Sequence, residues 1–146
     1  MPTMNLAAAR SLLKDRLQAV EERIRAACRR ANRAREEVTL VAVTKYVGCE
    51  IAALLPEFGV LDLGESRPQE LWRKAAALPK DVRWHLVGHL QRNKIEKTLP
   101  LVHLIHSVDS VRLLKALYEE AEKQDRHVDV LLEFNLSREP AKHGFD

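Results

Sequence analysis

Lys45 is the residue whose type and position point most directly to chemistry. It follows the run 38–44, which is almost wholly apolar and rich in β-branched residues, and which therefore predicts a buried strand. A lysine amine that emerges from an apolar strand can be desolvated, and desolvation favours the neutral, nucleophilic form. Such an amine forms a Schiff base with a carbonyl compound. Position alone is explained more simply by a lysine that ends a strand and extends its ammonium group into water.

Further polar residues accompany the later apolar runs. These runs predict strands at 60–64, 82–87, 102–106 and 128–134. Ser66, Asp109 and Asn135 follow three of them, and His85 lies within another. Because the carboxyl ends of parallel strands meet at one rim, we expect a ligand site there. Ser66 and Asp109 also fit a simpler role as helix caps, and His85 fits that of a hydrogen-bonded core residue.

The pattern of elements predicts an α/β fold. Apolar residues recur at three- and four-residue spacing from about 6 to 34, which predicts a long amphipathic helix before the first strand. Five predicted strands then alternate with helices, so the sheet is expected to be parallel with right-handed crossovers. No linker divides the 146 residues, which suit a single domain spanning 1–146. Length alone favours an open doubly wound sheet, because a closed (β/α)₈ barrel typically needs about 250 residues.

Several function classes have no support in the sequence. It contains neither a phosphate-binding glycine loop nor a GxSxG or HExxH motif, and its two cysteines show no metal-ligand spacing. We therefore predict no metal site. The net charge of +3 is the balance of 24 basic and 21 acidic side chains, which gives no electrostatic footprint for nucleic acid. With no membrane-length apolar run and no secretory signal, we expect a cytoplasmic protein.

The rim residues suit a ligand that carries a carbonyl group. A lysine supplies the amine, while serine, histidine and asparagine side chains can hydrogen-bond ring substituents. Pyridoxal phosphate fits this description, and so does a keto-sugar phosphate of the kind that lysine-dependent aldolases bind. Residue type and spacing do not separate these two ligands.

A resemblance to a known family separates them. The run 84–94, Trp-His-Leu-Val-Gly-His-Leu-Gln-Arg-Asn-Lys, closely resembles the WHFIGxLQxNK signature of the pyridoxal phosphate homeostasis proteins. Three further blocks match in order: 40–45 resembles LxAVSK, 63–70 resembles FGENxxQE, and 135–144 resembles NxSxExxKxG. The resemblance covers nearly the whole chain, and the eleven-residue signature is specific.

This resemblance implies a fold, a cofactor and a role. The fold is a (β/α)₈ barrel like the N-terminal domain of alanine racemase, with about the first five βα units present after the long helix. Lys45 is expected to hold pyridoxal 5'-phosphate as an internal aldimine, with His85 near the cofactor. Ser66 takes the position of an asparagine beside the cofactor ring. The role implied is that of a cytoplasmic, mostly monomeric carrier or regulator in vitamin B6 homeostasis, without established turnover.

The sequence departs from the family pattern in two ways. Ser66 is shorter than the asparagine that it replaces. The sequence also ends at Asp146, after the fifth predicted strand, whereas the family continues for three more βα units. Those units carry the loops that hold the cofactor phosphate, in agreement with phosphate sites after the last two strands of such barrels. Two unpaired sheet edges then predict marginal stability and self-association.

Two other functions stay open at this point. The chain could be an enzyme, either an amino acid racemase that depends on pyridoxal phosphate or a Schiff-base aldolase. A racemase needs a second acid/base group, and Tyr46 is expected on the opposite side of its strand while Tyr118 is expected on a helix. The chain could also be a truncated remnant that binds no cofactor.

Overall fold

The computed structural model describes residues 5–139 and 141–145 and contains one sheet of five parallel strands. The predicted domain, 1–146, includes residues 1–4, 140 and 146, which lie outside the described ones. The strands are β1 (Ala42–Val43), β2 (Asp62–Glu65), β3 (Arg83–Leu86), β4 (Val102–Val108) and β5 (Asp129–Leu132). They lie in the order β1-β2-β3-β4-β5, so each strand pairs with the next one along the chain.

This strand order decides between the two predicted architectures. A doubly wound sheet reverses its strand order at a switch point, whereas a barrel sheet runs on in one direction. The sheet therefore has the topology of a (β/α) barrel, as the resemblance implied, and the expectation from length alone was wrong. Within the described residues the barrel is not closed, because β1 and β5 are the two edges of the sheet.

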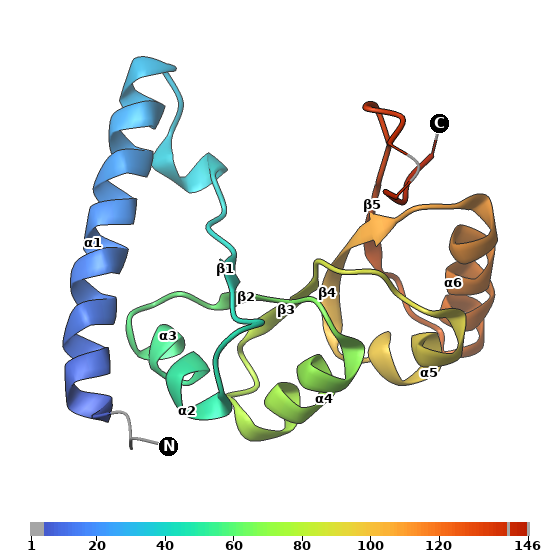
Figure 1. Cartoon of the computed structure of the whole chain (residues 1–146), viewed down its shortest axis with the longest axis horizontal. Helices are drawn as coiled ribbons and strands as arrows, with labels where there is room; N and C mark the ends of the chain where they lie inside the picture. Colours follow the sequence, from blue (N-terminus) through green and yellow to red (C-terminus); the bar gives the residue numbers. More distant parts are fainter. Residues whose placement is uncertain (1–4, 140, 146) are drawn as a thin grey trace.

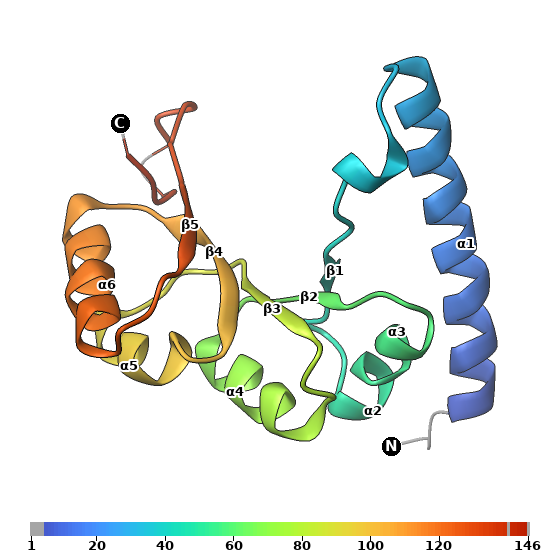
Figure 2. The same ribbon diagram turned by 180° about the vertical axis from the view of Figure 1, so that it is seen from behind.

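The helices cover one side of the curved sheet. After α1 (Leu6–Arg30) and the 3₁₀ turn η1 (Arg35–Glu37), the elements are α2 (Cys49–Ala52), α3 (Leu54–Glu57), α4 (Pro68–Ala77), η2 (Arg92–Lys94), α5 (Ile95–Thr98) and α6 (Val111–Lys123). Helices α2 to α6 follow the sheet in chain order, and α1 stands beside the β1 end (Figure 1). The reverse view shows the same single helical layer (Figure 2).

The core lies between the sheet and this helical layer. Leu63, Leu86 and Ile105 point from β2, β3 and β4 toward the helices, where Leu71 of α4 and Leu117 of α6 meet them, and all five are buried. Strand side chains alternate between the two faces, so every second residue of β2 and β3 faces away from the helices. Full burial of a leucine or isoleucine side chain in this core contributes about 1.5–3 kcal/mol to folding.

Strand β1 is much shorter than the sequence predicts. Only Ala42 and Val43 pair, with Leu63 and Gly64 of β2, and the preceding residues 38–41 are not in a strand. The reason is the partner: β2 begins at Asp62, so 38–40 have no neighbouring strand to accept and donate their backbone hydrogen bonds. The apolar pattern of residues 38–41 is nevertheless that of a buried strand, which is why the sequence predicted a longer strand than the structure contains.

Two helix boundaries also differ from the sequence predictions. Helix α1 ends at Arg30 rather than near residue 34, because Asn32 adopts a left-handed backbone with φ of 54° that no helix continues. The single helix expected at 50–58 is divided into α2 and α3. Pro56 lacks the N–H that would bond to the carbonyl of Ala52, so one continuous helix cannot keep its ladder.

Ser66 and Asp109 do not cap the helices that follow them. Arg67 is the N-cap of α4, and Pro68 begins the helix with its preset φ. Ser110 is the N-cap of α6, where its Oγ accepts a hydrogen bond from the Leu113 N–H at 3.3 Å. The cap prediction was wrong by one residue in both helices, and the side chains of Ser66 and Asp109 are free for other contacts.

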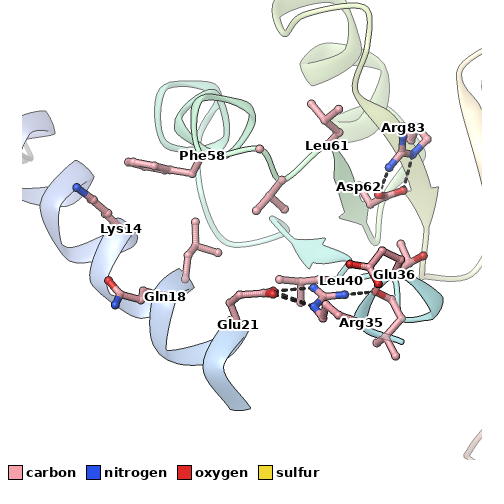
Figure 3. A pocket seen from close by; sticks show the side chains of 15 residues that line it. Lys14, Gln18, Glu21, Arg35, Glu36, Leu40, Phe58, Leu61, Asp62 and Arg83 are labelled. Atoms are coloured by element: carbon pink, nitrogen blue, oxygen red, sulfur yellow. Dashed lines mark hydrogen bonds and ion pairs between the residues drawn. The ribbon is translucent and has the colours of Figure 1, made fainter. Parts of the chain in front are cut away.

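An ion pair ties α1 to the rest of the chain. Arg35 donates from Nε to Glu21 Oε1 at 2.9 Å and from a terminal nitrogen to Oε2 at 2.7 Å, and it also donates to the carbonyl of Val38 (Figure 3). The hydrogen bonds from Arg35, with further help from Arg25, lower the pKa of Glu21 to about 2. The pair joins residues 14 positions apart in sequence and so fixes α1 beside η1.

Replacing Glu21 by glutamine should therefore destabilise the chain in a pH-dependent way. The pair is partly exposed, so we expect a loss of no more than about 1 kcal/mol in the free energy of unfolding at pH 7. Because folding lowers the pKa of Glu21 from 4.5 to about 2, the stabilisation is complete above pH 4.5 and is lost as the pH falls toward 2. Urea unfolding should show a smaller difference between Glu21→Gln and wild type at pH 3.5 than at pH 7. Glu22→Gln serves as the matched control, and an equal loss in both variants would refute the assignment.

Candidate functional site

The carboxyl ends of β1, β2 and β3 form a continuous rim. Beyond the paired strands, the Thr44 N–H donates to the Gly64 carbonyl and the Val87 N–H donates to the Glu65 carbonyl, both at 2.8 Å. Lys45 and Ser66 therefore come directly after paired positions on neighbouring strands. The register brings the backbones of Lys45 and Ser66 to neighbouring strand ends, with Lys45 exposed and Ser66 half-buried, and a shared ligand site there stays a prediction.

Gly88 lies where the chain leaves β3, the third strand whose carboxyl end forms the rim. A Cβ atom at Gly88 would lie 2.3 Å from the backbone oxygen of Ser66, so no side chain fits at this position. Ser107 donates from Oγ to the Gly88 carbonyl and ties the turn after β3 to the end of β4. Because the Ser66 backbone packs directly against Gly88, this position of the signature requires glycine.

Lys45 itself differs from the expectation in its surroundings. Its side chain is exposed, and its Nζ lies 5.0 Å from the centroid of the Tyr46 ring, which is 90% exposed. The described residues therefore leave the Lys45 amine in contact with solvent, although the apolar run before it predicted a desolvated amine. Tyr46 was expected on the side away from the lysine, and this was wrong, because its ring face lies beside the amine.

His85 belongs to a buried polar network on the face of the sheet away from the helices. Its Nε2 lies 2.9 Å from Asp62 Oδ1 and its Nδ1 lies 2.9 Å from His106 Nε2, so both ring nitrogens have partners. Arg83 pairs with Asp62 from the same side. The structure thus places His85 in the hydrogen-bonded position that the simpler interpretation suggested, and its contact with a cofactor stays a prediction.

The network sets the charges of two of its members. Hydrogen bonds from Arg83 lower the pKa of Asp62, against the opposing effect of burial, and His85 lowers it further. Burial lowers the pKa of His106 below 6.5, and the neighbouring His85 adds to this effect. At neutral pH the network therefore contains an ionised Asp62 and an uncharged His106.

Because folding lowers the pKa of His106, we expect the folding stability of the chain to depend on pH. Below pH 6.5 the unfolded chain binds a proton at this histidine and the folded chain resists it, so folding stability falls as the pH drops. In His106→Gln this contribution is absent, and the melting temperature should fall less between pH 7.5 and 5.5 than in wild type. Thermal unfolding at both pH values measures it, with the exposed His127→Gln as control. A His106→Gln variant with the wild-type pH dependence would contradict the assignment.

A second buried cluster, which sequence reasoning missed, lies behind the rim. Glu65 and Lys74 form an ion pair with 1% exposure on each side chain. Lys74 Nζ also donates to the Thr44 carbonyl at 2.8 Å, and Thr44 Oγ1 donates to Glu65 Oε1 at 2.7 Å. The pair therefore holds the backbone of the residue directly before Lys45.

The sequence did contain a signal for this cluster. Leu71, Lys74 and Ala75 lie on one buried stripe of α4 at helical spacing, so a charged residue interrupts an apolar face. Glu65 likewise has the same parity as Leu63 along β2 and must point toward the helices. A buried charge needs a partner, and each residue predicts the other.

Breaking this pair on one side should be costly. Lys74→Met leaves the carboxylate of Glu65 buried without its cation, and we expect a loss of about 3–5 kcal/mol in the free energy of unfolding. The double variant Lys74→Met with Glu65→Leu removes both charges, so it should recover most of that loss. Urea unfolding measures both. If the double variant is no more stable than Lys74→Met, the pair does not have this role; the exposed Lys80→Met is the control.

A pocket of about 640 Å³ lies at the other end of the strands. Its walls come from α1, η1, the residues before β1 and β2, and the first residues of β2 and β3, with Leu40, Leu61 and Phe58 among them (Figure 3). The charged groups in its walls include two pairs that satisfy each other, Glu21 with Arg35 and Asp62 with Arg83. In barrels this end serves stability rather than ligand binding, so the rim remains the candidate site.

Comparison with known proteins identifies the family. The sequence profile described as alanine racemase, N-terminal domain, matches residues 16–146. The chain belongs to this family. The fold agrees, since the continuous parallel order of the sheet is that of a barrel. Within the described residues, no helix is both long and apolar enough to cross a membrane.

Curated members with similar sequences share one name. The pyridoxal phosphate homeostasis protein of Aquifex aeolicus is 37% identical over 133 residues, which are 90% of this chain and 58% of the relative. The human protein of the same name is 30% identical over 139 residues, 88% of this chain and 50% of the relative. The resemblance seen in the sequence is confirmed. The chain spans 58% and 50% of the lengths of these two relatives.

Two solved structures superpose well on the chain. An unknown protein from Bifidobacterium adolescentis has a TM-score of 0.87 at 36% identity and covers 95% of this chain and 61% of its own. PipY of Synechococcus elongatus, solved with pyridoxal phosphate bound, has a TM-score of 0.65 at 34% identity and covers 84% and 57%. Both matches confirm the fold.

Proposed function

We propose that this chain binds pyridoxal 5'-phosphate through a Schiff base on Lys45 and acts in vitamin B6 homeostasis. The observation that carries the proposal is the position of Lys45 just after the carboxyl end of β1, next to the strand end that Ser66 follows. Ligands of βα barrels bind at this rim. The pyridoxal phosphate bound to PipY, a relative with the same fold, supports the identity of the cofactor.

The surroundings of Lys45 suit a covalent ligand. Among residues 5–139 and 141–145, no carboxylate pairs with its amine, so Nζ is open to an aldehyde. The buried pair of Glu65 and Lys74 holds the Thr44 carbonyl, which keeps the backbone of Lys45 in place while its side chain remains free. Ser66 offers a hydroxyl at the adjacent strand end, where a short side chain leaves room for a ring.

A carrier or regulator fits these observations better than an enzyme. A racemase needs an acid/base hydroxyl opposite the lysine, yet Tyr46 presents its ring face to the amine and Tyr118 is 64% exposed on α6. The shared name of the relatives, a homeostasis protein, supports the same reading. Racemisation of L-alanine by the loaded chain, lost in Tyr46→Phe, would favour the enzyme instead.

We also propose a location for the protein and a surface for its association. We place the protein in the cytoplasm because its curated relative is named a pyridoxal phosphate homeostasis protein, a role that fits this compartment. Self-association finds support at the β5 edge, where Leu131, Leu132 and Phe134 are each about half exposed, at 49%, 47% and 53%. Contact between two copies through this edge would cover them.

Lys45→Ala should abolish covalent cofactor binding. The purified chain is mixed with pyridoxal phosphate, the Schiff-base absorbance band is recorded, and borohydride reduction followed by peptide mapping locates the modified lysine. We expect modification at Lys45 in wild type and in the exposed-lysine control Lys80→Ala, and loss of the band in Lys45→Ala. Labelling scattered over surface lysines, unchanged in Lys45→Ala, would refute the proposal and favour a chain that does not bind the cofactor.

A further inference from the structure

Three potential metal ligands meet on the rim away from Lys45. His89 follows β3, Asp109 follows β4, and His143 lies in the segment after β5, and one ligand atom from each lies within 4.8 Å of the other two. Asp109 Oδ2 is 2.9 Å from His89 Nδ1 and 4.0 Å from His143 Nδ1. The sequence spacing shows no such cluster, because the three residues belong to three different βα units.

The chain holds the backbone of each of these residues in place. The His143 segment is pinned to the end of β5, because Phe145 donates to the Glu133 carbonyl at 2.7 Å and Asn135 donates to the Phe145 carbonyl at 2.8 Å. Gly144, with φ of 132°, makes this return possible, since a Cβ there would lie 2.7 Å from the Asn135 nitrogen. The placement of His143 is therefore a property of the fold.

His89 and Asp109 have comparable support. Gly88, packed on the backbone of Ser66, fixes the turn that carries His89. Asp109 is 9% exposed, and its second oxygen accepts a hydrogen bond from Ser110 Oγ at 3.1 Å. A nearly buried carboxylate thus directs one oxygen at two exposed imidazoles, which are 48% and 68% exposed and able to turn.

We propose that His89, Asp109 and His143 bind a divalent transition metal ion of the zinc class. Two imidazoles and one carboxylate are the ligand set of open zinc sites, and one negative charge suits a dication. With bonds of about 2.0–2.2 Å, adjacent ligand atoms of a tetrahedral ion lie about 3.4 Å apart. The two observed separations, 2.9 and 4.0 Å, bracket that value. The imidazole rings now stack with centroids 4.8 Å apart, so binding requires each exposed ring to rotate.

The surroundings leave a coordination position open. His89 and Asp109 line a hollow of about 210 Å³ together with Arg92 and Arg112. Three protein ligands leave a fourth position for solvent or a ligand, and the two guanidinium groups favour an anion there. The site is separate from Lys45, which follows β1, and the proposal does not depend on cofactor binding.

Isothermal titration of the purified, cofactor-free chain with Zn²⁺ tests this proposal. We expect one ion per chain, and a loss of affinity of at least roughly tenfold in His89→Gln and in His143→Gln, the smallest loss seen when even a residue supporting a metal ligand is removed. His127→Gln, an exposed histidine outside the cluster, should bind like wild type. Mg²⁺ should not bind, because it prefers oxygen ligands.

Three titration results would overturn the proposal. They are an affinity unchanged in both cluster variants, an equal loss in His127→Gln, or a Mg²⁺ affinity that matches that of Zn²⁺. His143 is mostly exposed, so His143→Gln should keep the wild-type melting temperature and separates loss of a ligand from loss of the fold. Co²⁺ absorbance distinguishes nitrogen and oxygen ligands from the thiols of Cys28 and Cys49, whose charge-transfer band would also count against the cluster.

Discussion

The buried pair of Glu65 and Lys74 is the constraint around which the rim is organised. It connects β2, α4 and the end of β1, because Lys74 reaches both the carboxylate of one strand and the carbonyl of Thr44 beside the next. In a low-dielectric interior such a pair is stable only when every polar atom has a partner, and here Thr44 supplies the remaining contacts. The same geometry that satisfies the two charges also determines where the chain leaves β1 and where Lys45 begins.

In this arrangement the backbone before Lys45 is fixed, whereas the side chain of Lys45 is accessible to solvent. Lys45 is exposed, while its backbone neighbour Thr44 is held from within the protein. Strand β1 contributes only two paired residues, which alone would hold the lysine loosely. The side-chain cluster compensates for the short ladder. A mobile side chain on a fixed backbone is what a covalent carrier requires, since the amine must reach its ligand and the ligand must then stay in one place.

The two faces of the sheet have different roles in this chain. The helical face buries leucines and isoleucine together with one ion pair. The opposite face carries Asp62, Arg83, His85 and His106 in a hydrogen-bonded network. In a closed barrel that face points inward, so its polar groups must satisfy one another, as they already do here. His85 in the family signature therefore has a structural reason that is independent of any cofactor.

The sequence by itself determined the element types, the family and the rim position of Lys45, because these depend on local periodicity and on contiguous motifs. It misplaced the extent of β1 and the caps at Ser66 and Asp109, since strand length depends on a partner strand and cap choice on a one-residue difference in backbone. Only the tertiary structure decided the strand order, the pairing of Glu65 with Lys74, and the meeting of His89, Asp109 and His143. These features join residues from separate βα units, and their distances are set by how the units pack rather than by spacing along the chain.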